Sequence, residues 1–321
     1  MKTVILDKCT IVTDNDISFD PIYDVSDVEE YDLLTEDEII DAAQDADAII
    51  CNKAEITEQI FDSCKKLKFV GLFATGYNNI DLDAADKHHV FVANVPGYST
   101  ESVAQHTFGM ILALASSICQ YDSSVKSGEW CRSAAFSYLT YPITEIYGKT
   151  LGIFGFGTIG KAVARIGEAF GMNVIVHTRT KPSDCKFAFV SKEELFAKSD
   201  FLTFHCPLNS DTYGIVNKIT LSLMKPTAYL INTSRGGIVI ENDLRDALNS
   251  GVIAGAGIDV VSAEPMKEDN PLRTAKNTII TPHVAWASSE ARIRLISKVA
   301  ENLSAFKNGR PINIVNSPKG V

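Results

Sequence analysis

A chain of 321 residues, 45% hydrophobic and 22% charged, is long enough for two globular domains and excludes a largely disordered protein. Its formal net charge of −10, with no basic run of five residues, argues against a nucleic-acid partner, because an acidic surface repels phosphates. Seven dispersed cysteines without a C-x-x-C pair argue against both a zinc site and a disulfide framework.

The N-terminus, MKTVILD, has too short an apolar run for a signal peptide. The longest apolar stretch, residues 110–115, falls far below the ~20 residues of a membrane span. We therefore expect a cytoplasmic protein with reduced thiols, no metal site and no membrane anchor.

Short apolar runs alternate with helical patterns along the first hundred residues. Strands are predicted at 3–6, 48–51, 68–73 and 90–93. Polar segments with helical spacing lie between them at 35–45, 57–66 and 81–89. This alternation predicts βαβ units in a parallel sheet.

The segment NVPGYST, residues 94–100, interrupts the alternation. Ser99 or Thr100 is expected to cap a long helix that runs to residue 118, and a less regular stretch is expected over 121–147.

A second alternation follows. Its strands are predicted at 151–154, 173–177, 201–205, 228–233, 254–260 and 277–283, and its helices at 159–170, 192–198, 242–249 and 288–307. The fold class is therefore α/β, with two doubly wound parallel-sheet domains.

Gly155, Gly157 and Gly160 form a G-x-G-x-x-G pattern between a predicted strand and a predicted helix. In this setting the first glycine permits a tight turn, the second lets the backbone approach a pyrophosphate, and the third lets helix and strand pack closely. The phosphates would lie over the helix N-terminus, where N–H groups are free. A glycine-rich turn without a ligand is the alternative.

The strand that follows ends at His177, and an acidic residue that binds the ribose of NAD is expected at the next position. Thr178 stands there instead, followed by Arg179, Thr180 and Lys181. Without a carboxylate, the 2′-phosphate of NADP is not repelled, and Arg179 could bind it. The pattern therefore favours acceptance of NADP(H), with Arg179 stacked on the adenine of NAD(H) as the alternative.

Four polar residues fall at or after the ends of the later strands: Arg235, Asp259, Glu264 and His283. The carboxyl ends of strands line the ligand crevice of an open α/β sheet, so these residues are expected to converge. Taken singly, each could be a turn, loop or surface residue. Together they fit hydride transfer to a 2-keto acid: arginine binds the carboxylate and polarises the ketone, and histidine, oriented by a carboxylate, supplies the proton.

The chain resembles the D-isomer-specific 2-hydroxyacid dehydrogenase family over nearly its whole length. The matching motifs are ATGYNNID, NVPGYSTESVAQHTF, GKTLGIFGFGTIG, MKPTAYLINTSRGG, AGAGIDV and TPHVAW. It is most similar to the D-glycerate dehydrogenase (hydroxypyruvate reductase) branch.

The resemblance implies that Arg235 binds substrate, that His283 is the general acid and base, and that Glu264 pairs with His283. Asp259 would hold the nicotinamide carboxamide. The remaining implied contacts are Thr158 and Ile159 to pyrophosphate, Cys206 and Pro207 to the adenine ribose, Thr233 and Ala285 to nicotinamide, Ala74, Thr75 and Gly76 to the substrate carboxylate, and Lys53 to the substrate pocket.

The resemblance also implies a flavodoxin-like substrate domain, residues 1–99 and 288–321, and a Rossmann dinucleotide-binding domain, residues 100–287. It implies a homodimer to which the helix after NVPGYST contributes. The expected function is NAD(P)-dependent reduction of a small 2-keto acid, hydroxypyruvate or glyoxylate, to the D-2-hydroxy acid, and the reverse oxidation. Oxidation of phosphite or formate, and a dinucleotide-sensing protein without turnover, are the alternatives.

Overall fold

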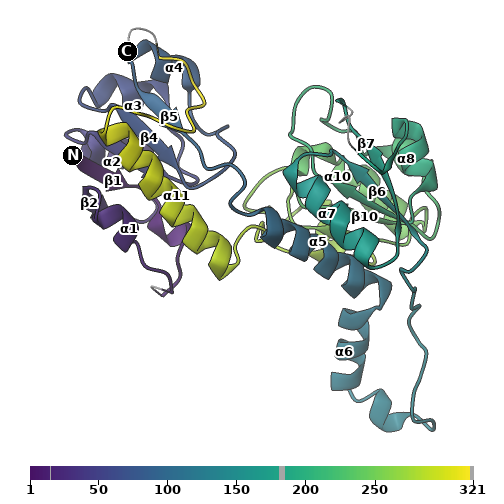
Figure 1. Ribbon diagram of the computed structural model, residues 1–321. Coiled ribbons are helices and arrows are strands. Elements are labelled where there is room, and N and C mark those ends of the chain that lie inside the picture. Colours follow the sequence, from purple (N-terminus) through teal and green to yellow (C-terminus); the bar gives the residue numbers. More distant parts are fainter. Residues whose placement is uncertain (15, 181–184, 319–321) are drawn as a thin grey trace. The chain divides into compact units, whose positions relative to one another are not determined.

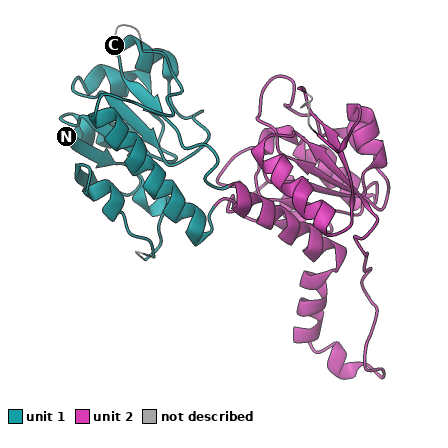
Figure 2. Cartoon of the chain, viewed as in Figure 1, with its two compact units in different colours: residues 1–99, 287–321 teal, residues 100–286 magenta. Residues whose placement is uncertain are grey.

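The protein divides into two compact units, seen here in a computed structural model that describes residues 1–14, 16–180 and 185–318. Unit 1 comprises Met1–Ser99 and Ala287–Val321, and unit 2 comprises Thr100–Trp286 (Figure 2). The sequence placed the second boundary one residue later. Each unit has a parallel sheet with helices packed on it, which confirms the predicted fold class.

Unit 1 contains a five-stranded sheet in the order β2-β1-β3-β4-β5, the flavodoxin-like order (Figure 1). Its strands are β1 (Lys2–Ile5), β2 (Asp27–Glu30), β3 (Ala48–Cys51), β4 (Phe69–Leu72) and β5 (Phe91–Ala93). Its helices are η1 (Lys8–Thr10), α1 (Asp20–Tyr23), α2 (Glu36–Ala43), α3 (Glu58–Ser63), α4 (Leu82–Lys87) and α11 (Ser289–Lys307). The last helix returns to this unit, where the ring of Phe306 stacks on that of Phe69.

Unit 2 contains a seven-stranded sheet in the order β12-β11-β10-β9-β6-β7-β8. Its strands are β6 (Thr150–Phe154), β7 (Asn173–His177), β8 (Ala188–Phe189), β9 (Phe201–Phe204), β10 (Tyr229–Asn232), β11 (Gly255–Ile258) and β12 (Thr278–Ile280). Its helices are α5 (Thr100–Ala115), α6 (Ile118–Lys126), η2 (Trp130–Arg132), α7 (Thr158–Ala169), α8 (Lys192–Lys198), α9 (Lys218–Leu221), η3 (Gly236–Ile238), α10 (Glu241–Asn249) and η4 (Pro271–Thr274). The strand order reverses at β6, as in a Rossmann fold.

Two strands escaped the sequence prediction, and both lie at sheet edges. The first, β2, has the sequence DVEE, with one apolar residue, because an edge strand exposes much of its surface to solvent. The second, β8, is only two residues long. Neither carries the apolar run that marks the buried strands.

The helix predicted to run to residue 118 is broken. α5 ends at Ala115, and Ser117 adopts a left-handed φ of 50° before α6 begins. α6 and η2 therefore occupy the start of the stretch expected to be irregular. Among the described residues no single helix is long and apolar enough to cross a membrane; α5 and α6 meet that test only jointly, across a bend of 60°.

A buried carboxylate fixes the first loop of unit 1. Asp7 follows β1 and accepts the backbone N–H groups of Asn52, Lys53 and Ala54 at 2.6–3.0 Å. Burial raises the pKa of Asp7, and these N–H groups oppose that shift. The loop that carries Lys53 is therefore held by the side chain of Asp7, together with the amide of Asn79, which donates to the carbonyl of Ala54 at 2.7 Å.

Replacing Asp7 with alanine leaves three buried N–H groups without an acceptor, so we expect a loss of at least about 3 kcal/mol in the free energy of unfolding. Asp45 provides a control, because it pairs with Lys66 on the surface at 2.6 Å, and Asp45→Ala should cost at most about 1 kcal/mol. Urea unfolding of both variants measures the difference; equal losses would contradict a dominant role for Asp7.

Candidate active site

The candidate catalytic side chains follow three neighbouring strands of unit 2. Arg235 lies after β10, Glu264 lies in the loop after β11, and His283 lies after β12. These strands are parallel and adjacent, so their carboxyl ends meet at one edge of the sheet. The structure thus gathers at this edge residues that are far apart in the sequence.

His283 and Glu264 form a direct pair. Nδ1 of His283 lies 2.6 Å from Oε2 of Glu264, and the backbone N–H of Val261 donates to Oε1 of the same carboxylate at 3.1 Å. A carboxylate only accepts, so Nδ1 carries the hydrogen. Nε2 is then the nitrogen that can exchange a proton with a substrate.

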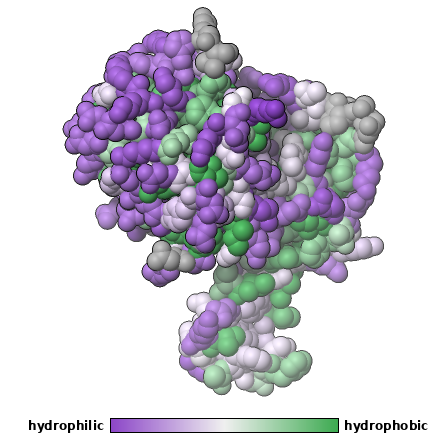
Figure 3. Space-filling view, turned by 60° about the vertical axis from the view of Figure 1, so that its left-hand side comes forward, coloured by the Kyte–Doolittle hydropathy of each residue, from purple (hydrophilic) through white to green (hydrophobic). Residues whose placement is uncertain are grey.

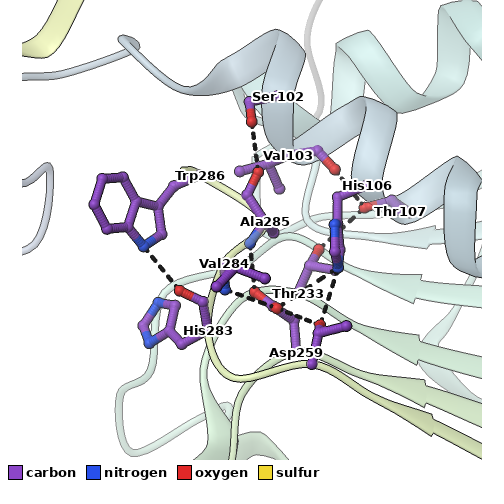
Figure 4. A network of polar contacts seen from close by, with 11 residues as sticks. Ser102, Val103, His106, Thr107, Thr233, Asp259, His283, Val284, Ala285 and Trp286 are labelled. Carbon is purple, nitrogen blue, oxygen red and sulfur yellow. Dashed lines mark hydrogen bonds and ion pairs between the residues drawn. The ribbon is translucent and has the colours of Figure 1, made fainter. Parts of the chain in front are cut away.

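The main chain at His283 is in an unusual conformation, with a φ of 56°. For a residue other than glycine this costs about 1–3 kcal/mol, so neighbouring contacts must hold it. The N–H of His283 donates to the carbonyl of Asp259 at 2.7 Å, and its carbonyl accepts from the indole of Trp286 at 2.9 Å (Figure 4). The imidazole is therefore presented by a fixed backbone.

Asp259 is buried and anchors the same segment. Its carboxylate accepts from the hydroxyl of Thr281 at 2.5 Å. It also accepts from the backbone N–H groups of Val284 and Ala285 at 2.9 and 3.0 Å (Figure 4). The residue singled out for the nicotinamide carboxamide thus already binds three donors of its own chain. In the sequence, Thr281 stands out only as the first residue of the TPHVAW motif, and no role was predicted for it.

Arg235 is exposed, and its guanidinium donates to the carbonyl of Ser234 at 2.7 Å. The buried Asn232 holds the loop by donating to the carbonyl of Arg235 at 2.9 Å. A Cβ on Gly236 would overlap the carbonyl of Val261, so glycine is required where this loop meets the segment leading to Glu264. Sequence reasoning also missed Asn232, which it had assigned only to a strand.

The three glycines of the G-x-G-x-x-G pattern are needed for different structural reasons. Gly155 has a φ of 95°, and a Cβ there would lie 2.6 Å from the carbonyl oxygen of His205. A Cβ on Gly160 would overlap the carbonyl of Gly155. Contacts with the protein's own backbone therefore require glycine at both positions. A Cβ on Gly157, in contrast, would meet no described atom within 4 Å, so open space remains there for a ligand.

That open space lies at the N-terminus of α7. Gly157 is the N-cap residue and offers no side chain to the first N–H groups, including those of Thr158 and Ile159. Free N–H groups and the positive end of the helix dipole suit an anion. The pyrophosphate of a dinucleotide fits this place.

The strand-order reversal brings two further predicted segments to the glycine turn. The N–H of Gly155 donates to the carbonyl of His177 at 2.8 Å, which places Thr178 beside the turn from the β7 side. Cys206 and Pro207 come from the other side, after β9. The sheet thus sets these segments on opposite sides of the glycine turn.

Of the ribose-side residues, Thr178 is half-buried and Arg179 and Thr180 are exposed. Lys181 lies outside the described residues.

On the opposite side of the glycine turn, after β9, burial lowers the pKa of His205 to about 3 and raises the pKa of Cys206 to about 11. Both are therefore neutral at pH 7 and add no charge beside the phosphate position.

Helix α5 contacts the two residues predicted to line the nicotinamide. The buried hydroxyl of Thr233 lies 3.1 Å from that of Thr107, and Ser102 donates to the carbonyl of Ala285 at 2.7 Å. Neither Thr107 nor Ser102 was singled out from the sequence.

The predicted substrate residues of unit 1 follow β3 and β4, which are adjacent and parallel. Lys53 is exposed on the loop that Asp7 holds. The carbonyl of Ala74 accepts from the N–H of Val95 at 2.8 Å, and the hydroxyl of Thr75 donates to the carbonyl of Val95 at 2.8 Å. Gly76 continues the same loop. The backbone of this loop is therefore anchored to the strand connection that follows β5.

Comparison with known proteins gives a consistent result. The family model for the D-isomer specific 2-hydroxyacid dehydrogenase, NAD binding domain, matches residues 108–285. A hydroxypyruvate reductase of Blautia hydrogenotrophica is 39% identical, over 98% of this chain and 100% of its own. A glycerate dehydrogenase of Methylorubrum extorquens is 40% identical, over 88% of this chain and 90% of its own.

Solved structures agree. An NADPH-dependent glyoxylate/hydroxypyruvate reductase of Sinorhizobium meliloti has a TM-score of 0.83 and 29% identity, covering 98% of this chain and 97% of its own. An acyclic imino acid reductase in complex with NADPH and D-Arg has a TM-score of 0.87 and 32% identity, covering 98% and 100%. The resemblance seen in the sequence is confirmed: the chain belongs to the D-isomer-specific 2-hydroxyacid dehydrogenase family.

Proposed function

We propose that the protein reduces a small 2-keto acid, hydroxypyruvate or glyoxylate first, to the D-2-hydroxy acid and catalyses the reverse oxidation. The observation that carries this proposal is the pair of His283 and Glu264 at 2.6 Å, at the sheet edge that also carries Arg235. The names of the hydroxypyruvate and glyoxylate reductases among the relatives support the substrate class.

The nicotinamide dinucleotide, when bound, supplies the hydride that is added to the carbonyl carbon of the keto acid. His283 donates the proton from Nε2 to the carbonyl oxygen, so that one hydride and one proton make the alcohol. Glu264 accepts from Nδ1 and stabilises the protonated imidazole before transfer. In the oxidation, Nε2 takes the hydroxyl proton back.

Arg235 is proposed to bind the substrate carboxylate and polarise the ketone with its planar guanidinium. Its exposure and its short loop leave the guanidinium available for that contact. We also propose that the backbone of Ala74, Thr75 and Gly76 receives the carboxylate and that Lys53 borders the substrate pocket. The anchoring of both loops supports these roles.

For the dinucleotide we propose that Gly155, Gly157 and Gly160 with Thr158 and Ile159 bind the pyrophosphate. Thr233, Asp259 and Ala285 would lie toward nicotinamide, and Cys206 and Pro207 toward the adenine ribose. We further propose that NADP(H) is accepted, because Thr178 brings no carboxylate and Arg179 is exposed beside it. Two structural relatives described with NADPH support this choice.

We propose that the protein is a homodimer to which α5, the helix after NVPGYST, contributes. α5 leads into the arm, defined as residues 118–147 of unit 2, which we add to the proposed interface. The arm extends from the body of unit 2 (Figure 1), and green apolar residues lie beside white and purple ones in the lower lobe of Figure 3. Phe136 and Leu139 are 91% and 84% exposed, and Trp130 is 50% exposed. Such a run of exposed apolar side chains is typical of an interface.

The arm is nevertheless ordered from within. The hydroxyl of Tyr121 donates to the carbonyl of Tyr141 at 2.8 Å, and the Trp130 indole donates to the carbonyl of Phe136 at 2.8 Å.

We also propose that the protein resides in a reducing compartment, the cytoplasm. All seven cysteines are free, and Cys9, Cys119 and Cys131 are exposed.

His283→Ala removes the proton donor, and we expect kcat with hydroxypyruvate to fall at least ~10²-fold while reduced cofactor still binds. The absorbance of the reduced cofactor measures turnover. His89→Asn, at an exposed histidine that also has a positive φ, serves as the control and should leave kcat unchanged. An unchanged rate for His283→Ala would remove His283 from this role, and no turnover of any small 2-keto acid by the wild type would overturn the proposed function.

Arg179→Ala should lower kcat/KM for NADPH at least ~10-fold and change kcat/KM for NADH by less than about 3-fold. Only NADPH carries a 2′-phosphate, and the substitution removes the guanidinium proposed to bind it. Arg245→Ala is the control, since Arg245 pairs with Asp246 on α10. Equal losses with the two cofactors would contradict phosphate binding by Arg179 and favour its stacking on adenine.

Phe136→Ser combined with Leu139→Ser should weaken dimer formation at least ~10-fold, because both side chains lose apolar area at the proposed contact. Sedimentation velocity over a range of concentrations measures this. Leu33→Ser, at a residue of unit 1 that is 69% exposed, should leave association unchanged. A wild-type protein that is monomeric at micromolar concentration would contradict the proposed dimer.

A further inference from the structure

His106 lies on α5 and reaches toward the segment that carries His283 (Figure 4). Its Nε2 is 3.0 Å from the hydroxyl of Thr281 and 3.6 Å from the carboxylate of Asp259. α5 approaches this closely because β11 has small residues: a Cβ on Gly257 would lie 2.9 Å from the sulfur of Met110. Nothing in the functions assigned above uses His106.

The direction of these hydrogen bonds follows from chemistry alone. The carboxylate of Asp259 can only accept, so Thr281 gives its one hydroxyl proton to Asp259 at 2.5 Å. The oxygen of Thr281 must then accept from His106, whose Nε2 carries a hydrogen. A one-way chain therefore runs from His106 through Thr281 to Asp259.

The chain ends in the backbone around His283. The carboxylate of Asp259 accepts hydrogen bonds from the N–H groups of Val284 and Ala285. The backbone carbonyl of Asp259 accepts one from the N–H of His283. Ser102, one turn before His106 on α5, donates to the carbonyl of Ala285 at 2.7 Å. Helix α5 thus holds this short segment at two points.

The segment needs such support, because the positive φ of His283 is costly unless the surroundings impose it. A proton donor displaced by 1 Å can lose on the order of 10²-fold in rate. The lost rate would appear in the chemical step, since no residue of this chain of hydrogen bonds needs to touch the substrate.

We propose that His106 is a positioning residue for His283 and acts through Thr281 and Asp259. The proposal rests on the proposed function only in taking His283 as the proton donor. It assigns to helix α5 a role in aligning the proton donor, in addition to its contacts with Thr233 and Ala285.

The test compares His106→Leu, which removes the donor, with His106→Gln, whose amide nitrogen can reach the position of Nε2. We expect His106→Leu to lower kcat with hydroxypyruvate ~10- to 100-fold, to leave KM for hydroxypyruvate within about 2-fold, and to raise the deuterium isotope effect on hydride transfer. His106→Gln should recover most of kcat. Gln105→Ala, at the exposed neighbouring residue of α5, is the matched control.

A second route does not depend on how well leucine is tolerated. Thr281→Val removes the hydroxyl at nearly constant shape, and it should give the same pattern. If both residues act through one chain of hydrogen bonds, the double variant should be no worse than the more damaged single variant. Additive losses, or a His106→Gln enzyme as slow as His106→Leu, would overturn the proposal.

Hydrogen exchange of the backbone gives a readout without turnover. The N–H groups of Val284 and Ala285 should exchange faster in His106→Leu than in wild type, and as in wild type in His106→Gln. Unchanged exchange and unchanged kcat in His106→Leu would reject the positioning role while wild-type turnover still supports the proposed function. A wild type without turnover would reject the proposed function, and the exchange result would still decide whether His106 holds the segment.

Discussion

The buried carboxylate of Asp259 is the constraint on which the His283 edge of the unit 2 sheet depends. A charge removed from water must be matched by hydrogen-bond donors, and here the donors are Thr281, Val284 and Ala285. Satisfying that one charge fixes the course of the chain on both sides of His283. The cost of a left-handed backbone at His283, the proposed proton donor, is thereby offset by a group that touches neither the imidazole nor its partner Glu264.

The same arrangement recurs in unit 1, where Asp7 accepts three backbone N–H groups and holds the loop that carries Lys53. In both units, a carboxylate at the carboxyl end of a parallel strand orders the next loop along the sheet edge. Loops are otherwise the most mobile part of such a fold. Rigid presentation of side chains from loops, which hydride and proton transfer require, is achieved here with few residues.

The glycine turn shows how one motif combines two requirements. Gly155 and Gly160 are demanded by contacts of the protein with itself, whereas the space at Gly157 remains open at the start of α7. The neutral state of His205 and Cys206, imposed by burial, keeps this corner free of competing charge. The turn is thus preformed by backbone packing before any dinucleotide arrives.

Local sequence alone determined the fold class, the glycine turn and the residue types for hydride transfer, because apolar runs, glycine spacing and strand ends are properties of short segments. It missed the edge strand β2, whose DVEE sequence has no buried face, and the break in α5 at Ser117, where the backbone turns left-handed. The family resemblance implied that Glu264 pairs with His283, and the tertiary structure decided that the contact is made at Nδ1. Tertiary structure alone decided that His106 approaches Thr281 and Asp259. These pairs join strands and a helix that become neighbours only when the sheet forms, so no spacing along the chain encodes them.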